Sequence, residues 1–286
     1  MKVAVIGANG QLGTEICEIF SQNCIVIPLI HKDIEISDID NVKKTLEAVK
    51  PQVVINTAAY HNVPKCEENP IHSFRINALG ALNLSKVSND LDFILVHFST
   101  DYVFDGQKKS PYIEDDEPNP LNIYGLTKLN GENLITNNCN KYFIIRVSGL
   151  YGRVPCRAKG GNFITTMIKA SKEKPVVKVV NDEILTPTSV IEISKNAYSL
   201  IQTEAYGLYH MTCQGECSWY EFAKVIFETL ELETPLQPCS VSDFPMAFER
   251  PRYSVLDNRN LKAINKDDMT FWKDALVNFL KETNNI

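Results

Sequence analysis

Tyr124 and Lys128 lie four positions apart in the stretch Tyr124-Gly125-Leu126-Thr127-Lys128, a Y-x-x-x-K spacing. Residues four apart share one face of a helix, so the phenol and the ammonium can reach into the same cleft. This pair suits carbonyl reduction, because hydride added to carbon leaves an alkoxide that must receive a proton. A free tyrosine has a pKa of about 10, and a nearby cation lowers that value toward neutral pH. We therefore expect Tyr124 to donate the proton. Lys128 would lower the pKa of Tyr124 and also hold the ribose of a nicotinamide cofactor.

A second polar group, Ser99-Thr100-Asp101, directly follows the apolar run at 93–98. Side chains at the carboxyl ends of parallel strands lie where open α/β sheets bind their ligands. The Thr100 hydroxyl would hydrogen-bond the substrate oxygen and share the charge that grows on it. We predict that Thr100, Tyr124 and Lys128 are the catalytic residues.

A glycine-rich loop, Gly7-Ala8-Asn9-Gly10-Gln11-Leu12-Gly13, joins the apolar run 3–6 to a helical pattern at 11–21. Glycines in such a loop allow a tight turn and let a pyrophosphate approach the backbone at a helix N-terminus. The spacing is G-x-x-G-x-x-G, wider than the usual G-x-G-x-x-G fingerprint. Its place between a strand and a helix predicts a dinucleotide cofactor.

Glu35, within 31–38, is placed near the adenosine end of that cofactor. An acidic group beside the ribose 2′-hydroxyl favours NADH, whereas His31 or Lys32 would accept a 2′-phosphate. These residues leave the choice open. We expect NADPH, with NADH also usable.

Apolar runs and helical patterns alternate through the first half of the chain. The expected strands are 3–6, 24–30, 53–55, 93–98 and 143–147, and the expected helices are 11–21, 41–49, 72–89 and 122–136. Continuous Val/Ile runs separated by helices indicate an α/β fold with a doubly wound, Rossmann-type parallel sheet. We assign 1–151 to an NAD(P)-binding Rossmann domain.

The pattern changes after residue 151, where glycines and prolines separate shorter elements. We expect 152–286 to form mainly a smaller α+β substrate-binding portion, with some segments returning to the Rossmann core. It contains an amphipathic helix at 218–230, with Ser218 and Glu221 spaced as in a capping box, and a closing helix near 271–280.

Composition narrows the function classes. The 286 residues carry a net charge of −6 without a dense Lys/Arg run, so nucleic acid is not an expected partner. No run of about 18 apolar residues predicts a membrane span, and the N-terminus lacks the apolar region of a signal peptide. The eight cysteines are scattered without a CxxC pair, so we expect reduced thiols, no metal site and a cytoplasmic location.

The longer motifs resemble those of the dTDP-4-dehydrorhamnose reductase family of extended short-chain dehydrogenase/reductases. The resemblance covers nearly the whole chain, and the string Ser99–Gly106 (STDYVFDG) is its most specific part. The other motifs that carry it are the glycine loop, 56–60 (NTAAY), 120–132 (PLNIYGLTKLNGE), 161–163 (GNF), 186–188 (TPT), 207–210 (GLYH), 218–220 (SWY) and 250–256 (RPRYSVL).

The resemblance implies NAD(P)H-dependent reduction of the 4-keto group of dTDP-4-dehydro-rhamnose, with a nucleotide sugar as substrate and a possible homodimer. With the glycine loop, it predicts a cofactor-binding set of Gly7, Asn9, Gly10, Gln11, Leu12, Gly13, Glu35, Ile36, Ala58, Ala59, Tyr60, Ser99, Tyr124 and Lys128. It predicts a substrate-binding set of His61, Val63, Thr100, Asp101, Asn162 and Arg250.

Two departures from the family pattern leave the sugar open. Gly149 stands where many members carry a tryptophan suited to stacking on the sugar, and Pro64 stands where an aspartate is common. Two other functions therefore stay in view. One is a non-catalytic NADP(H)-binding regulatory subunit, as in some relatives that regulate a methionine adenosyltransferase. The other is an epimerase or dehydratase that uses bound NAD without net redox.

Other polar or aromatic residues have structural interpretations. We expect His97 to be a hydrogen-bonded core histidine and Trp219 to pack in the core. The acidic run at 114–117 is expected to be a solvated loop, and Arg252 to lie at the surface or in an ion pair.

Overall fold

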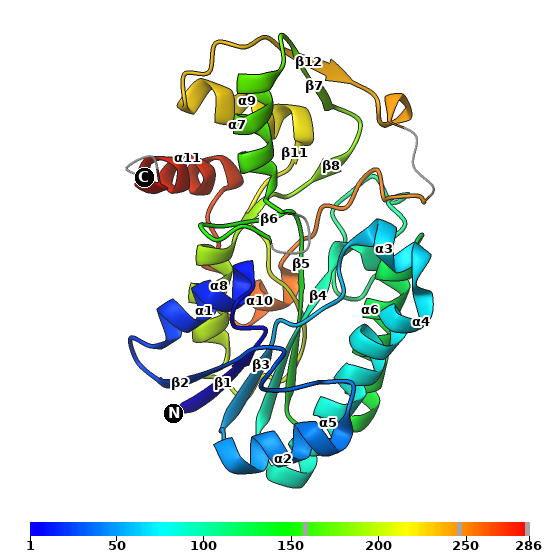
Figure 1. Ribbon diagram of the computed structural model, residues 1–286, viewed down its shortest axis with the longest axis vertical. Coiled ribbons are helices and arrows are strands. Elements are labelled where there is room, and N and C mark those ends of the chain that lie inside the picture. The colour runs from blue at the N-terminus through cyan, green and yellow to red at the C-terminus, as the bar shows by residue number, and fades with distance from the viewer. Residues whose placement is uncertain (157–159, 245–247, 284–286) are drawn as a thin grey trace.

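A six-stranded sheet forms the centre of the computed structural model, which describes residues 1–156, 160–244 and 248–283 (Figure 1). In spatial order its strands are β10 (Gly207–His210), β5 (Tyr142–Val147), β4 (Ile94–Thr100), β3 (Val53–Asn56), β1 (Lys2–Ile6) and β2 (Ile25–Leu29). All five pairings are parallel. The inner strands are apolar on both faces, as a covered parallel sheet requires. The predicted doubly wound α/β fold is confirmed.

Helices cover both faces of the sheet. On one face lie α1 (Gln11–Phe20) and α8 (Val190–Leu200), which pack against each other. On the other face lie α2 (Ile39–Val49), α5 (Gly80–Leu91) and α6 (Ile123–Asn138). The sequence predicted all of these helices except α8. Although α8 belongs to the later part of the chain, it packs against α1 in the hydrophobic core on that face of the sheet.

The single helix predicted over 72–89 differs in the structure. The segment consists of α4 (Pro70–Phe74), one π-helical turn η1 (Arg75–Leu79) and α5. Asn77 in the π turn accepts a hydrogen bond from the Tyr60 N–H and donates to the Tyr60 carbonyl and to Thr127. These bonds hold the loop after β3 beside α6. Turns of this kind are frequently found at functional sites.

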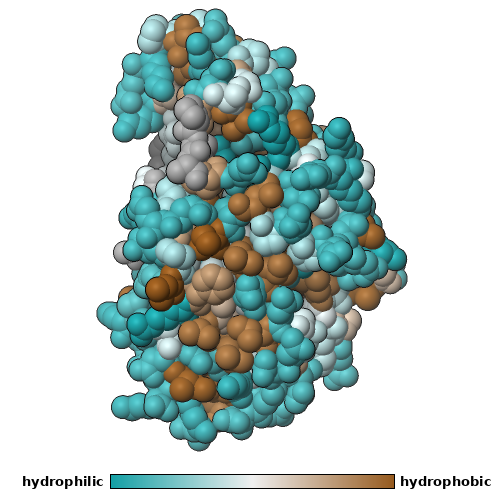
Figure 2. Space-filling view, turned by 90° about the vertical axis from the view of Figure 1, so that its right-hand side faces the viewer, coloured by the Kyte–Doolittle hydropathy of each residue, from teal (hydrophilic) through white to brown (hydrophobic). Residues whose placement is uncertain are grey.

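The side of the molecule formed by α4, η1 and α6 carries exposed apolar side chains. They are Ile71, Leu79 and Leu126. Figure 2 looks at this side and shows apolar side chains gathered across the middle of the face.

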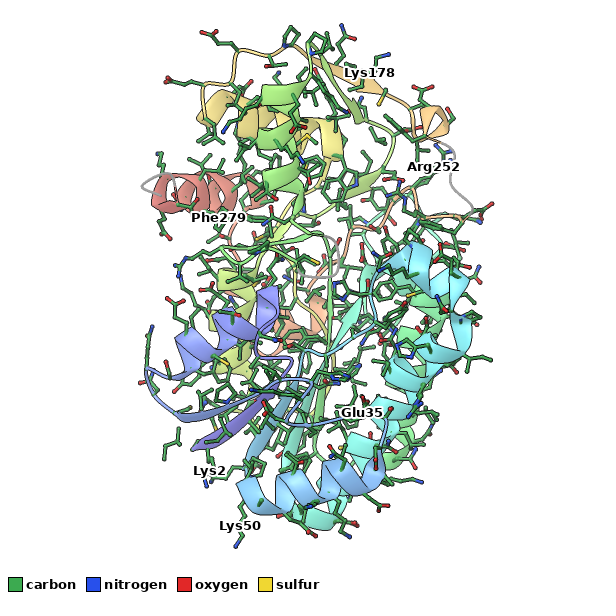
Figure 3. All side chains as sticks on the ribbon, in the orientation of Figure 1. Lys2, Glu35, Lys50, Lys178, Arg252 and Phe279 are labelled. Carbon is green, nitrogen blue, oxygen red and sulfur yellow. The ribbon has the colours of Figure 1, made fainter. Side chains whose placement is uncertain are left out.

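The smaller elements of the later chain lie beyond the carboxyl ends of the sheet strands (Figures 1 and 3). The later helices there are α7 (Phe163–Glu173), α9 (Trp219–Thr229) and α11 (Trp272–Thr283), while α10 (Arg259–Ala263) packs on β10. Helix α3 (Val63–Glu68) belongs to the first half of the chain and packs against α4 and α6. Three two-stranded pairs join β6 (Leu150–Tyr151) to β9 (Thr188–Ser189), β7 (Val177–Val180) to β12 (Leu236–Cys239), and β8 (Ile184–Leu185) to β11 (Cys217–Ser218). The capping box predicted for Ser218 and Glu221 is confirmed at the start of α9.

The acidic run at 114–117 was expected to be a solvated loop, but one of its residues is buried. Glu114 is buried, and its carboxylate accepts hydrogen bonds from the backbone N–H groups of His210 and Asn260. Burial raises the pKa of this carboxyl. Its neighbour Asp115 does lie at the surface, where it pairs with Arg259. Glu114 is buried because its carboxylate satisfies backbone N–H groups of the edge strand β10 and of the segment 259–263 that packs on it.

Three further features concern the part of the chain that the structure describes. None of its helices has both the length and the apolar character to cross a membrane. All eight cysteines fall within it, and none forms a disulfide. It contains no group of three or more His, Cys, Asp or Glu side chains arranged to hold a metal ion.

Candidate active site

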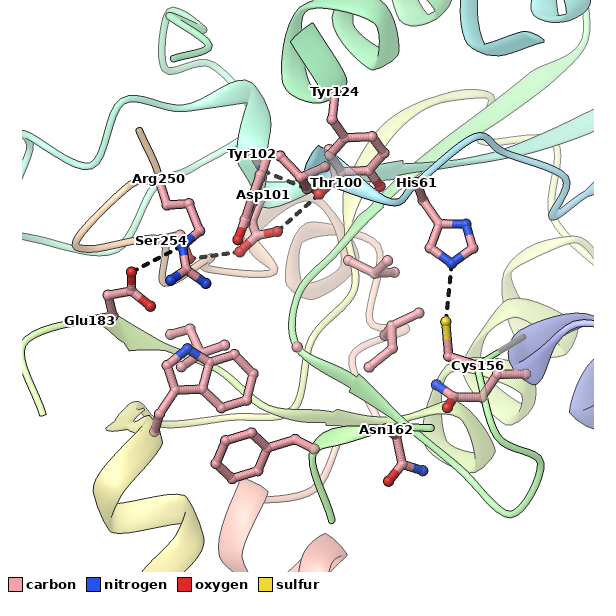
Figure 4. Close-up of a pocket in the computed structure, with 18 of the residues that line it drawn as sticks. His61, Thr100, Asp101, Tyr102, Tyr124, Cys156, Asn162, Glu183, Arg250 and Ser254 are labelled. Carbon is pink, nitrogen blue, oxygen red and sulfur yellow. Dashed lines mark hydrogen bonds and ion pairs between the residues drawn. The ribbon is translucent and has the colours of Figure 1, made fainter. Parts of the chain in front are cut away.

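A cavity of about 630 Å³ lies where the carboxyl ends of β1, β3, β4 and β5 meet the smaller elements. Its volume is within the range of small-molecule and cofactor sites. Figure 4 shows Tyr124, Thr100, Asp101, His61 and Arg250 around the same space. Residues far apart in the sequence therefore line one cavity.

The glycine loop has the geometry of a dinucleotide cradle. Gly7 has a φ of +80°, which glycine adopts without strain. A Cβ at Gly13 would overlap the Gly7 carbonyl oxygen, so the start of α1 lies directly against the loop. Gly10 is the N-cap of α1, and no side chain caps the helix. Its first N–H groups are thus available to an anion.

Two buried polar atoms at this end of the cavity have no partner among the described residues. They are Gln11 Oε1 and Ser99 Oγ. Buried polar groups are nearly always hydrogen-bonded, so such atoms in a cavity call for a ligand. The open helix N-terminus, the glycine cradle and these two atoms together fit a dinucleotide.

Replacing Gly13 by alanine should test the tightness of this cradle. We expect Gly13→Ala to lower the free energy of unfolding by about 1–3 kcal/mol, because the methyl group must displace backbone. Gly10→Ala is the matched control, since its Cβ would meet only the Gly7 oxygen at 3.2 Å. Urea unfolding followed by circular dichroism measures both. Equal losses in the two variants would contradict close contact between loop and helix at Gly13.

Thr100 and Asp101, at the end of β4, belong to a buried hydroxyl–carboxylate network. Asp101 Oδ1 accepts from Thr100 Oγ1 at 3.0 Å, while Oδ2 accepts from Ser148 Oγ at 2.7 Å and Ser254 Oγ at 2.6 Å. Burial raises the pKa of Asp101, and the three hydroxyl bonds oppose that shift. The sequence did not reveal Ser148 and Ser254 as partners. Asp101 lines the cavity as expected, yet its oxygens are bonded to the protein, so it orients the Thr100 hydroxyl.

Tyr124 lies near the start of α6, where Asn122 caps the helix by accepting from the Gly125 N–H at 2.9 Å. Burial raises the pKa of the Tyr124 phenol, although a hydrogen bond with Thr100 opposes the shift. The sequence predicted the reverse direction, with Lys128 lowering this pKa. The difference arises because burial dominates the phenol and Lys128 bonds elsewhere.

Lys128 is only 2% exposed, and its Nζ lies 2.9 Å from His97 Nε2. Burial lowers the pKa of Lys128 to about 8, while the charge of Glu132 acts in the opposite direction. His97 is itself buried, and burial followed by the charge of Lys128 holds its pKa well below the usual value. The prediction of a hydrogen-bonded core histidine is confirmed. Its position against Lys128 was not foreseen.

The predicted cofactor set divides in two. The members that line the cavity are Gly10, Gln11, Leu12, Gly13, Ala59, Ser99, Tyr124 and Lys128. The members that do not line it are Gly7, Asn9, Glu35, Ile36, Ala58 and Tyr60. Ile36 is buried against the helix that starts at Gly80, where a Cβ would lie 2.8 Å from the Ile36 side chain.

Glu35 lies beside the sheet rather than in the cavity (Figure 3). Its carboxylate accepts from the Ser37 N–H and hydroxyl and pairs with His31 at 3.0 Å. Partial burial acts against it, yet the Ser37 bonds and the charges of His31 and Arg75 hold the pKa of Glu35 below its usual value. Arg75 Nε also donates to the Ser37 hydroxyl at 3.0 Å. This region therefore holds the Arg75 guanidinium as well as an acid.

All six residues of the predicted substrate set line the cavity. His61 Nδ1 lies 3.2 Å from the Ala59 carbonyl oxygen, and its Nε2 lies 3.1 Å from Cys156 Sγ. Arg250 Nε lies 3.3 Å from Glu183 Oε1. Asn162 caps α7 and donates to the Gly152 carbonyl, so its amide holds the backbone rather than remaining available.

Aromatic and charged residues of the later chain add to the lining. Phe163 and Trp219 lie with ring centroids 4.6 Å apart, and both border the cavity. Trp219 thus packs, as predicted, and also forms part of the wall. Glu183 and Lys178 line it as well, although no sequence pattern marked them.

The two departures from the family pattern have local structural reasons. Gly149 has a φ of +56°, and a Cβ there would lie 2.9 Å from Leu185 Cδ1 and 3.0 Å from Pro187 Cα. A side chain at this position would require the neighbouring backbone to move. Pro64 stands in the first turn of α3, where proline is favoured because no intrahelical N–H bond is needed.

Known proteins resemble the chain over its whole length. The RmlD substrate binding domain family model matches residues 1–285. The spore coat polysaccharide biosynthesis protein SpsK of Bacillus subtilis is 36% identical, with 98% of this chain and 97% of that protein covered. The structure of a dTDP-4-dehydrorhamnose reductase from Clostridium acetobutylicum has a TM-score of 0.95 at 40% identity and covers 99% of this chain and 100% of its own.

A second similar structure was solved as a complex with a cofactor. The dTDP-4-dehydrorhamnose reductase of Bacillus anthracis, in complex with NADP, has a TM-score of 0.94 at 37% identity, with 99% of each chain covered. Both the sequence match and these structural matches extend across the sheet and the smaller elements. The chain therefore belongs to the RmlD substrate binding domain family.

Proposed function

We propose that the protein is an NADPH-dependent ketoreductase that reduces the 4-keto group of a nucleotide-linked 6-deoxy sugar. The proposed substrate is dTDP-4-dehydro-rhamnose, and the product is dTDP-rhamnose. The observation that carries the proposal is the presence of Thr100, Tyr124 and Lys128 on one cavity with the open N-terminus of α1. Relatives that are named dTDP-4-dehydrorhamnose reductase support the choice of sugar.

The cofactor fits the glycine-loop end of the cavity. The N–H groups at the start of α1 would bind its pyrophosphate, Gln11 and Ser99 would bond to its polar groups, and Lys128 would hold the nicotinamide ribose. When bound, NADPH supplies the hydride. Arg75, which lies beside Ser37 and Glu35, would bind a 2′-phosphate there, and a relative crystallised with NADP supports this preference.

Residues of the protein would supply the proton to the substrate oxygen and stabilise the charge that develops on it. In this structure the Thr100 hydroxyl donates its one proton to Asp101, and on binding the substrate it would turn that O–H to the carbonyl oxygen of the sugar. Tyr124 would give its proton to the same oxygen as the alkoxide forms. Burial raises the pKa of Tyr124, so the phenol keeps its proton until the alkoxide, which is a stronger base than a phenolate, takes it.

The substrate would lie between the sheet and the smaller elements. The sugar would lie near His61 and Val63, and Arg250 and Lys178 would bind the diphosphate. A guanidinium group presents paired N–H donors that match phosphate oxygens. This assigns 1–151 mainly to the cofactor and 152–286 mainly to the substrate. A homodimer is part of the proposal, and the exposed apolar side chains on α4, η1 and α6 support it.

The deciding experiment follows NADPH oxidation by absorbance with dTDP-4-dehydro-rhamnose generated in place by upstream enzymes. We expect rapid consumption, dTDP-rhamnose as the product in equal amount, and slower turnover with NADH. Binding of NADPH without consumption would overturn the assignment and direct attention to a regulatory subunit or another keto sugar. Interconversion of sugars without net NADPH consumption would indicate the epimerase or dehydratase alternative.

Thr100→Val should lower kcat by about 10²-fold, because one hydrogen-bond donor to the developing oxyanion is lost. Thr100→Ser keeps the hydroxyl and should remain within about tenfold of the wild type. Steady-state kinetics with NADPH and the keto sugar measure both variants. If valine and serine behaved alike, the Thr100 hydroxyl would have no part in the reaction.

A further inference from the structure

Three buried side chains beneath the cavity form a continuous hydrogen-bonded chain that ends at Lys128. Asn56 Oδ1 lies 3.1 Å from the Ala58 backbone nitrogen, and Asn56 Nδ2 lies 3.1 Å from His97 Nδ1. His97 Nε2 lies 2.9 Å from Lys128 Nζ. Asn56, His97 and Lys128 are each at most 2% exposed, so no bulk water interrupts the chain.

The direction of every bond in this chain follows from its first member. A backbone N–H can only donate, so Asn56 Oδ1 accepts from Ala58 and Asn56 Nδ2 must donate. His97 Nδ1 is then the acceptor, and a neutral imidazole with an accepting Nδ1 carries its proton on Nε2. That N–H points to Lys128 Nζ, and an ammonium has no lone pair with which to accept it. The chain is satisfied only when Lys128 is a neutral amine.

We propose that Asn56 and His97 are positioning residues that stabilise the neutral amine form of Lys128 through this directional chain. The opposite direction would require the Asn56 amide to turn over, which would set its NH₂ group against the Ala58 N–H. Two donors would then face each other in a buried place, at the cost of an unmade hydrogen bond.

The charged and titratable groups around Lys128 agree with this arrangement. His97 faces it from β4, and Tyr124 and Glu132 belong to its own helix α6. Glu132 favours the ammonium, but its carboxylate is bound by Arg146 from β5 at 2.6 Å. Burial prevails and brings the pKa of Lys128 to about 8. Both forms of Lys128 are therefore accessible near neutral pH.

The consequence for turnover rests on the proposed function. When Tyr124 has given its proton to the alkoxide, a Lys128 ammonium can return a proton to the phenolate through water in the cavity. The N–H bond of Lys128 breaks, the O–H bond of Tyr124 forms, and the amine left behind accepts the His97 Nε2–H. Lys128 then regains a proton from water in the cavity. The chain makes the intermediate amine less costly.

The first test needs no substrate, and it measures the unsubstituted protein, with two variants used only to assign the signals. NMR of protein labelled with ¹⁵N in histidine and lysine side chains reports the tautomer of His97 and the charge of Lys128. At pH 9 we expect His97 protonated on Nε2 only and Lys128 as an amine, with spectra of His97→Gln and Lys128→Arg giving the assignments. His97 protonated on Nδ1 beside a charged Lys128 would overturn the proposal.

His210 provides a matched comparison inside the same molecule. It is also buried, but its Nδ1 lies 3.1 Å from the Tyr112 carbonyl oxygen and 3.2 Å from that of Asp257. Carbonyl oxygens only accept, so His210 must carry its proton on Nδ1. We expect the two buried histidines to show opposite tautomers in one spectrum. Identical tautomers would contradict the direction assigned to the chain.

The second test reverses the chain. Asn56→Asp keeps an oxygen for the Ala58 N–H but gives His97 Nδ1 an acceptor, so Nε2 becomes an acceptor for a Lys128 ammonium. The pKa of Lys128 should rise by about one unit, measured by NMR. We expect kcat to fall at high pH as Lys128 loses its proton, and in the variant the midpoint of this fall should shift to higher pH by the same amount. A merely structural role would lower kcat without shifting the midpoint. In the double variant Asn56→Asp/His97→Leu, the pKa of Lys128 should no longer rise. An unmoved NMR titration in folded Asn56→Asp protein would overturn the proposal.

These tests separate the two proposals. The NMR titration stands even if dTDP-4-dehydro-rhamnose is not reduced, because it needs no turnover. If the sugar is reduced but the tautomer and the pKa of Lys128 do not behave as described, only the chain through Asn56 and His97 is wrong.

Discussion

Tyr124→Phe should lower kcat for keto-sugar reduction by about 10³-fold and leave NADPH affinity nearly unchanged. General acid catalysis by a positioned side chain contributes about 10²–10⁴-fold, and the phenylalanine retains every part of the side chain except the proton donor. The ring would keep its edge contact with Tyr102, whose centroid lies 5.9 Å away. The loss should therefore fall on the chemical step.

Single-turnover kinetics with NADPH already bound would isolate that step, and a fluorescence titration would give the NADPH affinity. Tyr102→Phe is the comparison, since it removes the hydroxyl of a second tyrosine that lines the same cavity. We expect it to cost less than about tenfold in kcat, because Tyr102 is not the proposed acid. A Tyr124→Phe enzyme within tenfold of wild type would show that another group protonates the alkoxide.

Arg146→Met should lower the free energy of unfolding by about 3–5 kcal/mol, the usual result of removing one partner of a buried ion pair. Arg146 Nε lies 3.0 Å and 3.2 Å from the two Glu132 oxygens, and Nη2 lies 2.6 Å from Oε2. The two side chains are only 3% and 4% exposed. The guanidinium also lies over the Phe104 ring, 5.1 Å from its centroid. Methionine fills most of the space but leaves the Glu132 charge uncompensated.

Urea unfolding of wild type and variant gives this energy difference directly. Lys43→Met, which breaks the exposed pair with Asp90, should change it by less than about 1 kcal/mol. Arg146→Met/Glu132→Leu should recover much of the loss, because no charge is then buried alone. If the single and double variants unfolded alike, the uncompensated carboxylate would not be the cause.

Sequence patterns predicted the parts of the fold that depend on local chemistry. Four of the five predicted strands, β1, β3, β4 and β5, are apolar runs that are buried in the sheet. The glycine loop is a local turn whose spacing is visible in the chain. The prediction of one regular helix at 72–89 was wrong. The π turn at Asn77 depends on hydrogen bonds with Tyr60 and Thr127, which lie on other parts of the fold. Strand β10 is as long as β3, but its sequence Gly-Leu-Tyr-His lacks the Val/Ile run that revealed β3.

The candidate site was predicted where function follows from residue type and position along the chain. Thr100, Tyr124 and Lys128 do line one cavity, as do the six residues of the substrate set. What the sequence could not supply were partners set by tertiary structure. Ser254 reaches Asp101 across 153 positions, and the direction of the Tyr124 pKa shift depends on burial that only the folded chain reveals.

The late return of β10 to the sheet bears on how the chain is made. Strand β5 bonds to β4 on one side and to β10 on the other, and α8 packs against α1. A nascent chain released from the ribosome as far as β5 would expose an unpaired strand edge and an uncovered face of α1, both of which favour aggregation. Completion of the sheet must wait until Gly207–His210 has been synthesised. Folding during translation and protection by chaperones should therefore matter most in that interval, and a truncation at residue 151 should not yield a soluble cofactor-binding fragment.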